Sequence, residues 1–289
     1  GKTVLMDGHI DTVDVIDAPQ WEHDPFGGEI ADGKIYGRGA SDMKGSDCAM
    51  ITAAARFAEK TGRDFAGRVC VSCTVHEERF EGVSSREITR LAKPDLVIIG
   101  EATSTTVKRG QRGRAEVVVE TEGVSCHSSN PEKGVNAVYA MTAVIDEIRK
   151  IVPNEHPLLG KGILELTDII SKPHPGLKAR CYLAEGEETC WTGDTIRAKR
   201  YFPAWVTEEG SDLVQAALKG LKDAGIEAPL SHFSFCTNGS SFCGEAGIPT
   251  IGYGPSLESL AHVRDEYIEI DQLLKSCKGF ESILTQLTR

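Results

Sequence analysis

Histidine and acidic residues recur along the sequence at positions where they could bind a metal ion. His9 and Asp11 stand one residue apart, directly after the apolar run 4–6. Alternate side chains of a β-strand point the same way, so the Asp11 carboxylate could orient the His9 imidazole, as in prepared metal ligands. A surface histidine beside an unrelated acid gives the same pattern. Because a metal site needs three or four ligands, the pair predicts one only if further ligands follow.

Further candidate ligands do follow in chain order. Asp42 comes after YGRGAS and before a helical pattern, where an ordinary N-cap is the alternative. Glu77 and Glu78 come after a β-branched run and could also be surface charge. Glu101 closes a solid apolar run, where an acid without a partner is unfavourable, and this favours a functional role. His262 lies in LESLAHVRDEY just past a Gly-rich turn and is, by itself, typical of a loop.

Alternating strands and helices must position these residues. Apolar runs predict three strands, over residues 2–9, 67–78 and 94–102. The spacing of apolar residues predicts a helix over 42–62 that ends at its glycine. Ligands gather beyond the carboxyl ends of strands in an open α/β sheet, and His9, Glu77, Glu78 and Glu101 stand at such ends. The sequence therefore predicts an α/β domain with a site at one edge of its sheet.

The pattern changes after this first segment. An inserted domain is indicated by an alternating strand, a helix and another strand, over residues 109–123, 135–151 and 162–170. The α/β character then resumes with a helix, a strand and a closing helix, over 211–225, 249–254 and from 270. We expect a catalytic domain in two parts, 1–108 and 184–289, with the inserted domain at 109–183.

Composition limits the classes of partner. The 289 residues are 40% hydrophobic and 26% charged, which is enough for one large or two ordinary domains. A net charge of −11 argues against nucleic acid and anionic membrane surfaces, and leaves small molecules. No stretch approaches a membrane span and the first residues lack a signal-peptide pattern, so a cytoplasmic location is expected.

The nine cysteines fit that compartment. They are odd in number and scattered through apolar segments, so we expect them to be reduced. Cys70 and Cys73 form a CxxC in a predicted strand, where positions i and i+3 face opposite sides. This pair is therefore not expected to chelate a metal or to act as a redox pair.

Taken in order, these motifs resemble a known family. They are H-x-D, GRGASDMKG, a strand followed by two acids, IGE, and AH before DEY. The chain resembles, over nearly its whole length, the di-zinc hydrolases that include acetylornithine deacetylase, succinyl-diaminopimelate desuccinylase and glutamate carboxypeptidase. The stretches RGRAEVVVETEGVSCHSS and FCTNGSSF are most similar to the selenium-metabolism-linked hydrolase subgroup. The resemblance implies a zinc-peptidase-like catalytic domain with a central, mostly parallel sheet, and an inserted α+β, ferredoxin-like lid and dimerisation domain.

Carried over residue by residue, the resemblance assigns the metal ligands. Asp42 would bridge two zinc ions, with cobalt or manganese as possible substitutes. His9 and Glu101 would complete one site, and Glu78 and His262 the other. Metals in such pairs lie about 3.5–4 Å apart, polarise a carbonyl and lower the pKa of a bound water to about 7. The ligand types suit that chemistry.

The resemblance also assigns the acids beside the ligands. Adjacency alone leaves open which of Glu77 and Glu78 is the general base, and the resemblance gives that role to Glu77. A general base takes the proton of the attacking water and delivers it to the leaving amine. Asp11 would stand behind His9. A cis peptide bond is implied at Asp42–Met43.

Two further segments match the family. In GVSCHSSNPEKGVNA, the resemblance implies that His127 belongs to the lid of a homodimer and stabilises the developing oxyanion in the partner's active site. The alternative, a Cys126–His127 nucleophile pair, is disfavoured because neighbours on an extended segment point apart. A loop of Gly, Asn and Ser type resembles the substrate-contacting loop, although any loop has this composition; its residues are Thr237, Asn238, Gly239 and Ser240.

The chain departs from the family pattern in two places. It begins almost on the strand of His9, whereas the family begins with a further helix and strand. After Gly176, between SKPHPG and LKARCYLAEG, we expect a strand with an Arg-rich end and a helix to be missing, together with the arginine that would hold a substrate carboxylate. The predicted function is hydrolysis of an amide bond in a small N-acyl amino acid or peptide. The alternative is a catalytically silent metal-binding or subunit-interaction relative.

Overall fold

The computed structural model describes residues 1–167, 172–173 and 178–288. The chain divides into two compact units, one made of Gly1–Arg114 with Phe202–Arg289 and the other of Ala115–Tyr201. The position after Gly176, where a strand and a helix were expected to be missing, lies outside the described residues. Within the described ranges, no helix is long and apolar enough to cross a membrane.

The helices and strands are close to those that the apolar patterns predict. The α-helices of the described residues are α1 (Gly45–Thr61), α2 (Ser85–Ala92), α3 (Ala137–Ile148), α4 (Asp212–Asp223) and α5 (Ile270–Leu287). Shorter helical turns are η1 (Ala18–Gln20), η2 (Ala40–Lys44), η3 (Pro131–Lys133), η4 (Ser240–Glu245) and η5 (Glu258–Leu260). Gly62, at a φ of 60°, ends α1 as expected of a glycine at that position.

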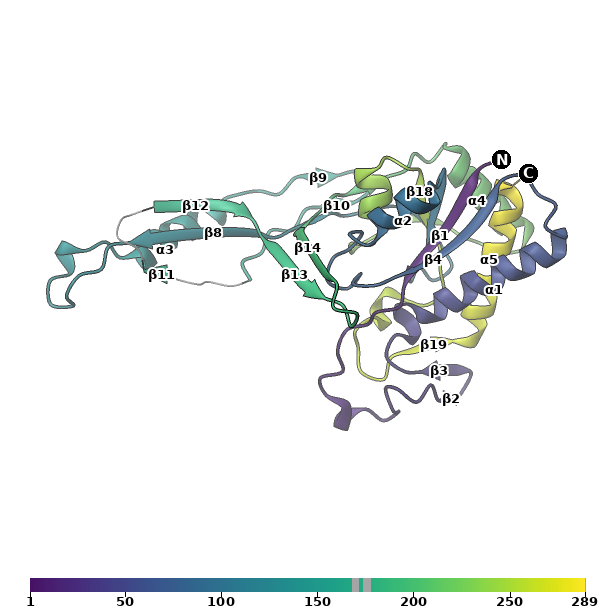
Figure 1. The fold of residues 1–289 in the computed structure, drawn as a ribbon, viewed down its shortest axis with the longest axis horizontal. Coiled ribbons are helices and arrows are strands. Elements are labelled where there is room, and N and C mark those ends of the chain that lie inside the picture. The colour runs from purple at the N-terminus through teal and green to yellow at the C-terminus, as the bar shows by residue number, and fades with distance from the viewer. Residues whose placement is uncertain (168–171, 174–177, 289) are drawn as a thin grey trace. The chain divides into compact units, whose positions relative to one another are not determined.

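A mixed, mostly parallel sheet forms the centre of the first unit (Figure 1). Its strands are β1 (Thr3–His9), β4 (Arg68–Thr74), β5 (Leu96–Ile99), β6 (Val107–Gln111), β16 (Trp205–Val206), β17 (Leu230–Phe233) and β18 (Thr250–Gly252). The order is β16-β6-β18-β5-β1-β4, with β17 also paired to β6. β1 runs parallel to β4 and β5, and β18 parallel to β5, whereas β6 is antiparallel to β18 and β16. The ends of β1, β4 and β5 therefore meet at one edge, as predicted.

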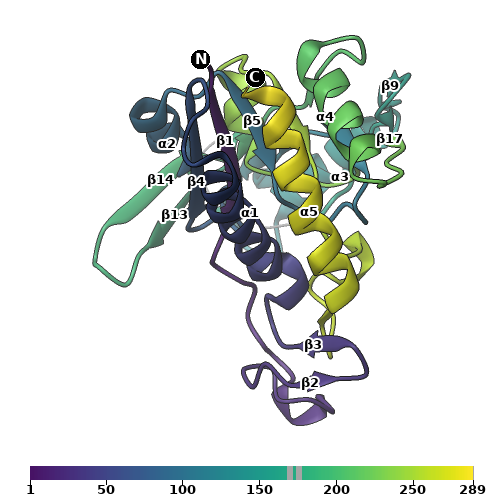
Figure 2. The ribbon, with the colours of Figure 1, turned by 90° about the vertical axis from the view of Figure 1, so that its right-hand side faces the viewer.

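Apolar side chains from alternate positions of the strands fill two cores. One face of the sheet packs against α1, α4 and α5, and α1 and α5 lie side by side over it (Figure 2). Val4 and Met6 of β1 point into this core, while Leu5 points into the core on the opposite face. The structure places all nine cysteines without a disulfide partner, and their reduced state stays a prediction. Cys70 packs on the side of Leu5 and Cys73 faces Asp47 of α1, so the CxxC residues do point apart.

The turn before α1 differs from the predicted helix. The helix begins at Gly45 rather than at Asp42, because Asp42 and Met43 have non-helical backbone angles (φ −124°, ψ 93° and φ −134°, ψ 25°). The backbone N–H of Asp42 donates to Glu266 instead. The cis peptide bond at Asp42–Met43 is present, which confirms that prediction.

A small sheet in the first unit brings two distant segments together. Its strands are β2 (Ile30–Ala31), β3 (Lys34–Tyr36) and β19 (Tyr267–Glu269). β3 pairs antiparallel with both β2 and β19. The pairing of β3 with β19 places the segment around His262 and Glu266 beside the turn that carries Asp42.

The second unit has α+β character. β8 (Val117–Gly123) pairs with β11 (Lys172–Pro173) and β12 (Lys178–Leu183), and Thr121 of β8 donates to the backbone of α3. Hairpins and short strands complete the described part: β9 (Glu155–His156) with β10 (Gly160–Lys161), β13 (Glu185–Thr189) with β14 (Thr195–Lys199), and the segments β7 (Arg114–Ala115) and β15 (Tyr201–Phe202). A complete ferredoxin-like arrangement stays a prediction.

The unit boundaries differ from the expected 109–183. The second unit starts later because β6 pairs within the central sheet, and it ends later because it includes the β13–β14 hairpin. The strand predicted over 162–170 is wrong for 162–167, which form no strand; the remainder lies outside the described residues. Ile163 and Leu164 are exposed there. An alternating segment becomes a strand only where a neighbour pairs with it.

Candidate metal centre

Asp42 lies between two histidines from distant parts of the chain. Its Oδ1 is 3.1 Å from Nε2 of His9, and its Oδ2 is 3.1 Å from Nε2 of His262. His9 is the last residue of β1, and His262 lies between η5 and β19 with a φ of 62°. Each carboxylate oxygen thus faces a different imidazole.

The predicted acids gather around these histidines. Glu101, just past β5, has its Oε1 3.3 Å from Nε2 of His9. Glu77, in the turn after β4, has its Oε2 3.8 Å from the same nitrogen, whereas Oε2 of Glu78 is 2.9 Å from Nε2 of His262. Among the described residues, two groups of three side chains place their possible ligand atoms within 4.8 Å of one another. One group is His9, Glu77 and Glu101, and the other is His9, Asp42 and Glu78.

Asp11 organises this part of the site, although not only in the expected way. Nδ1 of His9 is 2.9 Å from the backbone oxygen of Asp11 and 3.6 Å from its carboxylate Oδ1. The closer partner is thus the carbonyl, which can accept a hydrogen bond from Nδ1–H and so leave Nε2 free to face a metal. The carboxylate accepts hydrogen bonds from the backbone N–H groups of Glu77 and Glu78, both 3.2 Å long. Asp11 therefore connects His9 to the turn that carries the two acids.

Glu266 fixes the turn that carries Asp42, a role that no local sequence pattern predicts. Its side chain is fully buried. Oε1 accepts hydrogen bonds from the backbone N–H groups of Ser41 (2.8 Å) and Asp42 (3.0 Å). Oε2 accepts from the backbone of Gly39 (3.1 Å) and from Nη1 of Arg38 (2.7 Å). The only sequence signal is its place in the DEY motif, which gives no partner.

Burial and neighbouring charges shift the pKa values of the clustered side chains. Burial and the neighbouring Asp42 raise the pKa of Glu101 to about 7, and burial raises the pKa of Glu77 well above its usual range. Burial alone would lower the pKa of His9, but the surrounding carboxylates raise it well above its usual value. Hydrogen bonds to carboxylates raise the pKa of His262 to about 10. Without a metal, protons therefore occupy groups that a metal ion would bind.

The residues fit a divalent metal centre. Oε1 of Glu77 and Oε1 of Glu78 are buried and have no hydrogen-bond partner among the residues that the structure describes. A buried carboxylate oxygen without a donor is unfavourable unless a cation or water meets it. Imidazole nitrogen and carboxylate oxygen are also the donors that zinc takes in proteins.

The predicted lid residue lies in the second unit. His127 is exposed on the segment after β8, and its Nδ1 is 2.7 Å from Oγ of Ser129. Cys126 is also exposed, and its Sγ contacts the backbone oxygen of Pro131 at 3.9 Å. The role of His127 in a partner's site stays a prediction.

The predicted substrate loop supports the sheet. All four of its residues are buried: Thr237, Asn238, Gly239 and Ser240. Nδ2 of Asn238 donates to Asp7 and to Thr74, both at 2.9 Å, and its Oδ1 accepts from the backbone of Gly82 at 2.8 Å. Oγ1 of Thr237 donates to Gln111. These side chains hold the loop against β1, β4 and β6, and direct contact with a substrate stays a prediction.

A known protein family matches nearly the whole of this chain. The sequence profile of peptidase family M20/M25/M40 matches residues 5–286. The chain belongs to this family. M20 enzymes are metal-dependent hydrolases of amide or peptide bonds, and this chain is one of them.

Relatives and solved structures agree with the family. YgeY, an uncharacterized protein of Escherichia coli (strain K12), is 30% identical over 311 residues that cover 92% of this chain and 76% of that protein. Succinyl-diaminopimelate desuccinylase of Pseudoalteromonas translucida is 28% identical over 313 residues, covering 97% of this chain and 82% of the relative. The M20 family metallo-carboxypeptidase Sso-CP2 from Sulfolobus solfataricus has the same fold, with a TM-score of 0.68 at 19% identity over 98% of this chain and 84% of that one.

The matches also bear on the predicted gap in the lid. The aligned spans of 311 and 313 residues exceed the 289 residues of the chain. Both relatives therefore contain residues, inside the aligned span, that have no counterpart here. The segment expected to be missing after Gly176 would be one such stretch.

Proposed function

We propose that this M20 hydrolase cleaves the amide bond of a small N-acyl amino acid or peptide with the help of two divalent metal ions, expected to be zinc. His9 and Glu101 would hold one ion, Glu78 and His262 the other, and Asp42 would bridge them. One observation carries the proposal: the two oxygens of Asp42 face two different imidazoles, each at 3.1 Å. The pairing of Glu78 with His262, at 2.9 Å, supports the division of ligands between the two ions.

Glu77 is proposed as the general base. When bound, the two cations polarise the scissile carbonyl and lower the pKa of a water molecule. Glu77 Oε1 has no partner within the described part of the chain and is thus available to take a proton as that water adds to the carbonyl carbon. Burial raises the pKa of Glu77 above its usual range, which strengthens this carboxylate as a proton acceptor. Glu77 then delivers the proton to the amine nitrogen as the C–N bond breaks.

Turnover of a substrate panel tests this proposal. The full chain, loaded with zinc or cobalt, is assayed against N-acyl amino acids and dipeptides with and without a chelator. We expect hydrolysis of at least one compound, loss of activity with the chelator, and loss in Glu77→Gln. Glu87→Gln is the control, because Glu87 is an exposed acid of α2 that pairs with Arg90. Full metal binding without turnover of any compound would instead favour the catalytically silent alternative.

A homodimer is also proposed. The helix α3 of the second unit has no buried residue, and Val138 and Tyr139 are 52% and 74% exposed. An apolar helix of this kind supports contact with a second copy. Light scattering tests the dimer, and mixing His127→Ala with Glu77→Gln tests the role of His127. Mixed dimers regain one working site only if His127 acts on the partner subunit. The cytoplasmic location stays a prediction.

A further inference from the structure

Asp47, in the first turn of α1, is a buried acid that the proposed mechanism does not use. Its side chain is 4% exposed, and neither carboxylate oxygen has a hydrogen-bond partner of normal geometry among the described residues. The thiol of Cys73 faces it, but a thiol is only a weak donor. A carboxylate in this situation is unfavourable unless positive charge compensates it.

The start of α1, which carries Asp47, packs against the backbone just before two of the proposed ligands. A Cβ atom added to Gly8 would stand 2.2 Å from Oδ1 of Asp47, so the carboxylate occupies the space beside the residue that precedes His9. The start of α1 also packs against the end of β5. A Cβ added to Gly100, which precedes Glu101, would stand 2.9 Å from Oγ of Ser46. Asp47 and its neighbour thus contact the backbone of both strands whose ends carry a ligand.

Asp47 has no lysine or arginine partner among the described residues. Burial raises its pKa to about 7, so an ionised carboxylate is unfavourable there unless a cation lies nearby. Its Oδ1 lies against Gly8, the residue that precedes His9. In the metal-loaded protein, the ions proposed to be held through His9 and its neighbours would supply that positive charge.

We propose that Asp47 is an outer anion of the metal centre, whose buried carboxylate is balanced by the metal ions and raises their affinity. This inference rests on the two-metal site proposed above. It assigns Asp47 no contact with the metals or with the substrate. Asp47 acts through its charge, at a position where only a glycine at residue 8 leaves room for it.

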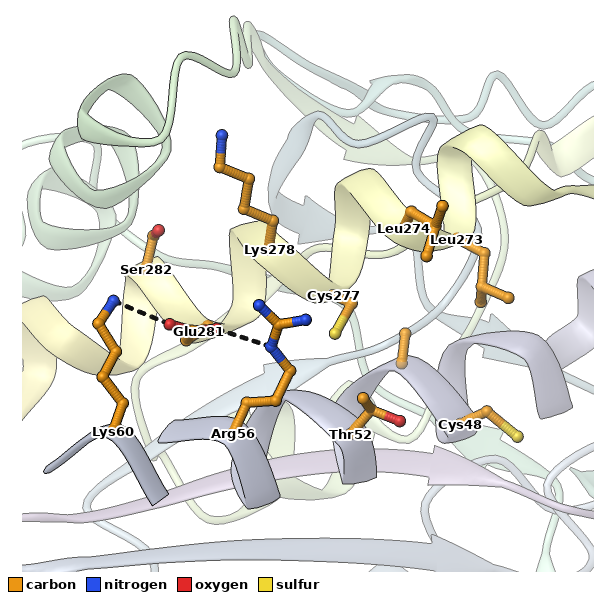
Figure 3. A pocket seen from close by; sticks show the side chains of 11 residues that line it. Cys48, Thr52, Arg56, Lys60, Leu273, Leu274, Cys277, Lys278, Glu281 and Ser282 are labelled. Carbon is orange, nitrogen blue, oxygen red and sulfur yellow. Dashed lines mark hydrogen bonds and ion pairs between the residues drawn. The ribbon is translucent and has the colours of Figure 1, made fainter. Parts of the chain in front are cut away.

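Another buried acid provides a matched control. Glu281 of α5 is 8% exposed and lines a groove of about 530 Å³ between α1 and α5. Its two oxygens are paired with Arg56 at 3.2 Å and Lys60 at 3.0 Å (Figure 3). Glu281 therefore has cations of its own and belongs to the packing of the two helices. Removing its charge should affect stability and leave the metal centre unchanged.

The test compares metal affinity with the stability of the metal-free protein. Asp47→Asn keeps the shape and removes the charge, and Asp47→Ala is a second variant that avoids placing an amide there. We expect the affinity for zinc, measured by chelator competition, to fall about 10- to 100-fold, the range found for residues behind metal ligands. The unfolding midpoint of the metal-free protein should not fall, because an uncompensated buried charge is gone. Glu281→Gln should show the opposite pattern, with unchanged affinity and a lower midpoint.

The outcomes separate this inference from the proposed function. Unchanged zinc affinity in both Asp47 variants, with normal binding by the wild-type chain, overturns the inference alone. A lower midpoint of the metal-free variants without a change in affinity also overturns it, because that is the behaviour of a structural residue. If the wild-type chain binds no zinc or cobalt, the two-metal proposal fails and this inference fails with it.

Discussion

Replacing Glu266 by glutamine should loosen the turn that carries Asp42. The carboxylate accepts four hydrogen bonds, two on each oxygen, from Arg38 and from three backbone N–H groups of residues 39–42. Glutamine keeps one oxygen and places an amide N–H where the second oxygen accepts two donors. Two bonds to a charged acceptor are then lost, each worth about 1.5–3 kcal/mol, and Arg38 is left buried without its partner.

We therefore expect Glu266→Gln to lower the free energy of unfolding by about 3–5 kcal/mol, the range for breaking a buried ion pair. For a chain of this size that corresponds to a fall of roughly 10 °C in the unfolding midpoint. Circular dichroism of the metal-free protein measures the midpoint, and elemental analysis measures metal content, which should also fall because Asp42 is displaced. Glu269→Gln is the control, since Glu269 is exposed in β19 and should change stability by less than about 0.5 kcal/mol. A Glu266→Gln variant of wild-type stability with both metals bound would refute the assigned role of Glu266.

Three further predictions concern the metal centre. Asp42→Ala should lose both metal ions per chain in elemental analysis, whereas His262→Ala, which removes a half-exposed ligand, should weaken mainly one; equal losses would contradict a bridging Asp42. Glu77→Gln should keep the metals and lower turnover by about two to four orders of magnitude. Loss of metal from Glu77→Gln but not from Glu78→Gln would mean that the two roles are reversed. Zinc binding at pH 7 should release protons, because the pKa of His262 is raised to about 10 and that of His9 lies well above its usual value. Affinity should therefore strengthen as the pH rises, and calorimetry in buffers of different ionisation enthalpy that shows no proton release would contradict this.

Much of the fold follows from local patterns. The runs that end at His9 and just before Glu101 are strands because apolar, β-branched residues dominate them and turns follow. The closing helix begins at Ile270 as its periodicity predicts. The start of α1 was not predictable in this way, since Asp42 and Met43 belong to a turn held by a distant acid. The residues 162–167 form no strand because their apolar pattern finds no pairing partner among the residues that the structure describes.

The sequence by itself determined the donor types, their order and the strands that carry them, because these depend on residue identity and on spacing within single segments. Only the tertiary structure decided which of these side chains lie next to one another. The pairing of β19 with β3 brings His262 and Glu266 to Asp42 across more than half of the chain, so that one carboxylate faces two imidazoles and another collects four donors. Burial also sets the environment of the charged groups. By its position in the sequence, Asp47 is an ordinary acid of a first helical turn, but the fold buries its carboxylate against Gly8. Such contacts depend on the register between segments far apart in sequence, and no local pattern contains that register.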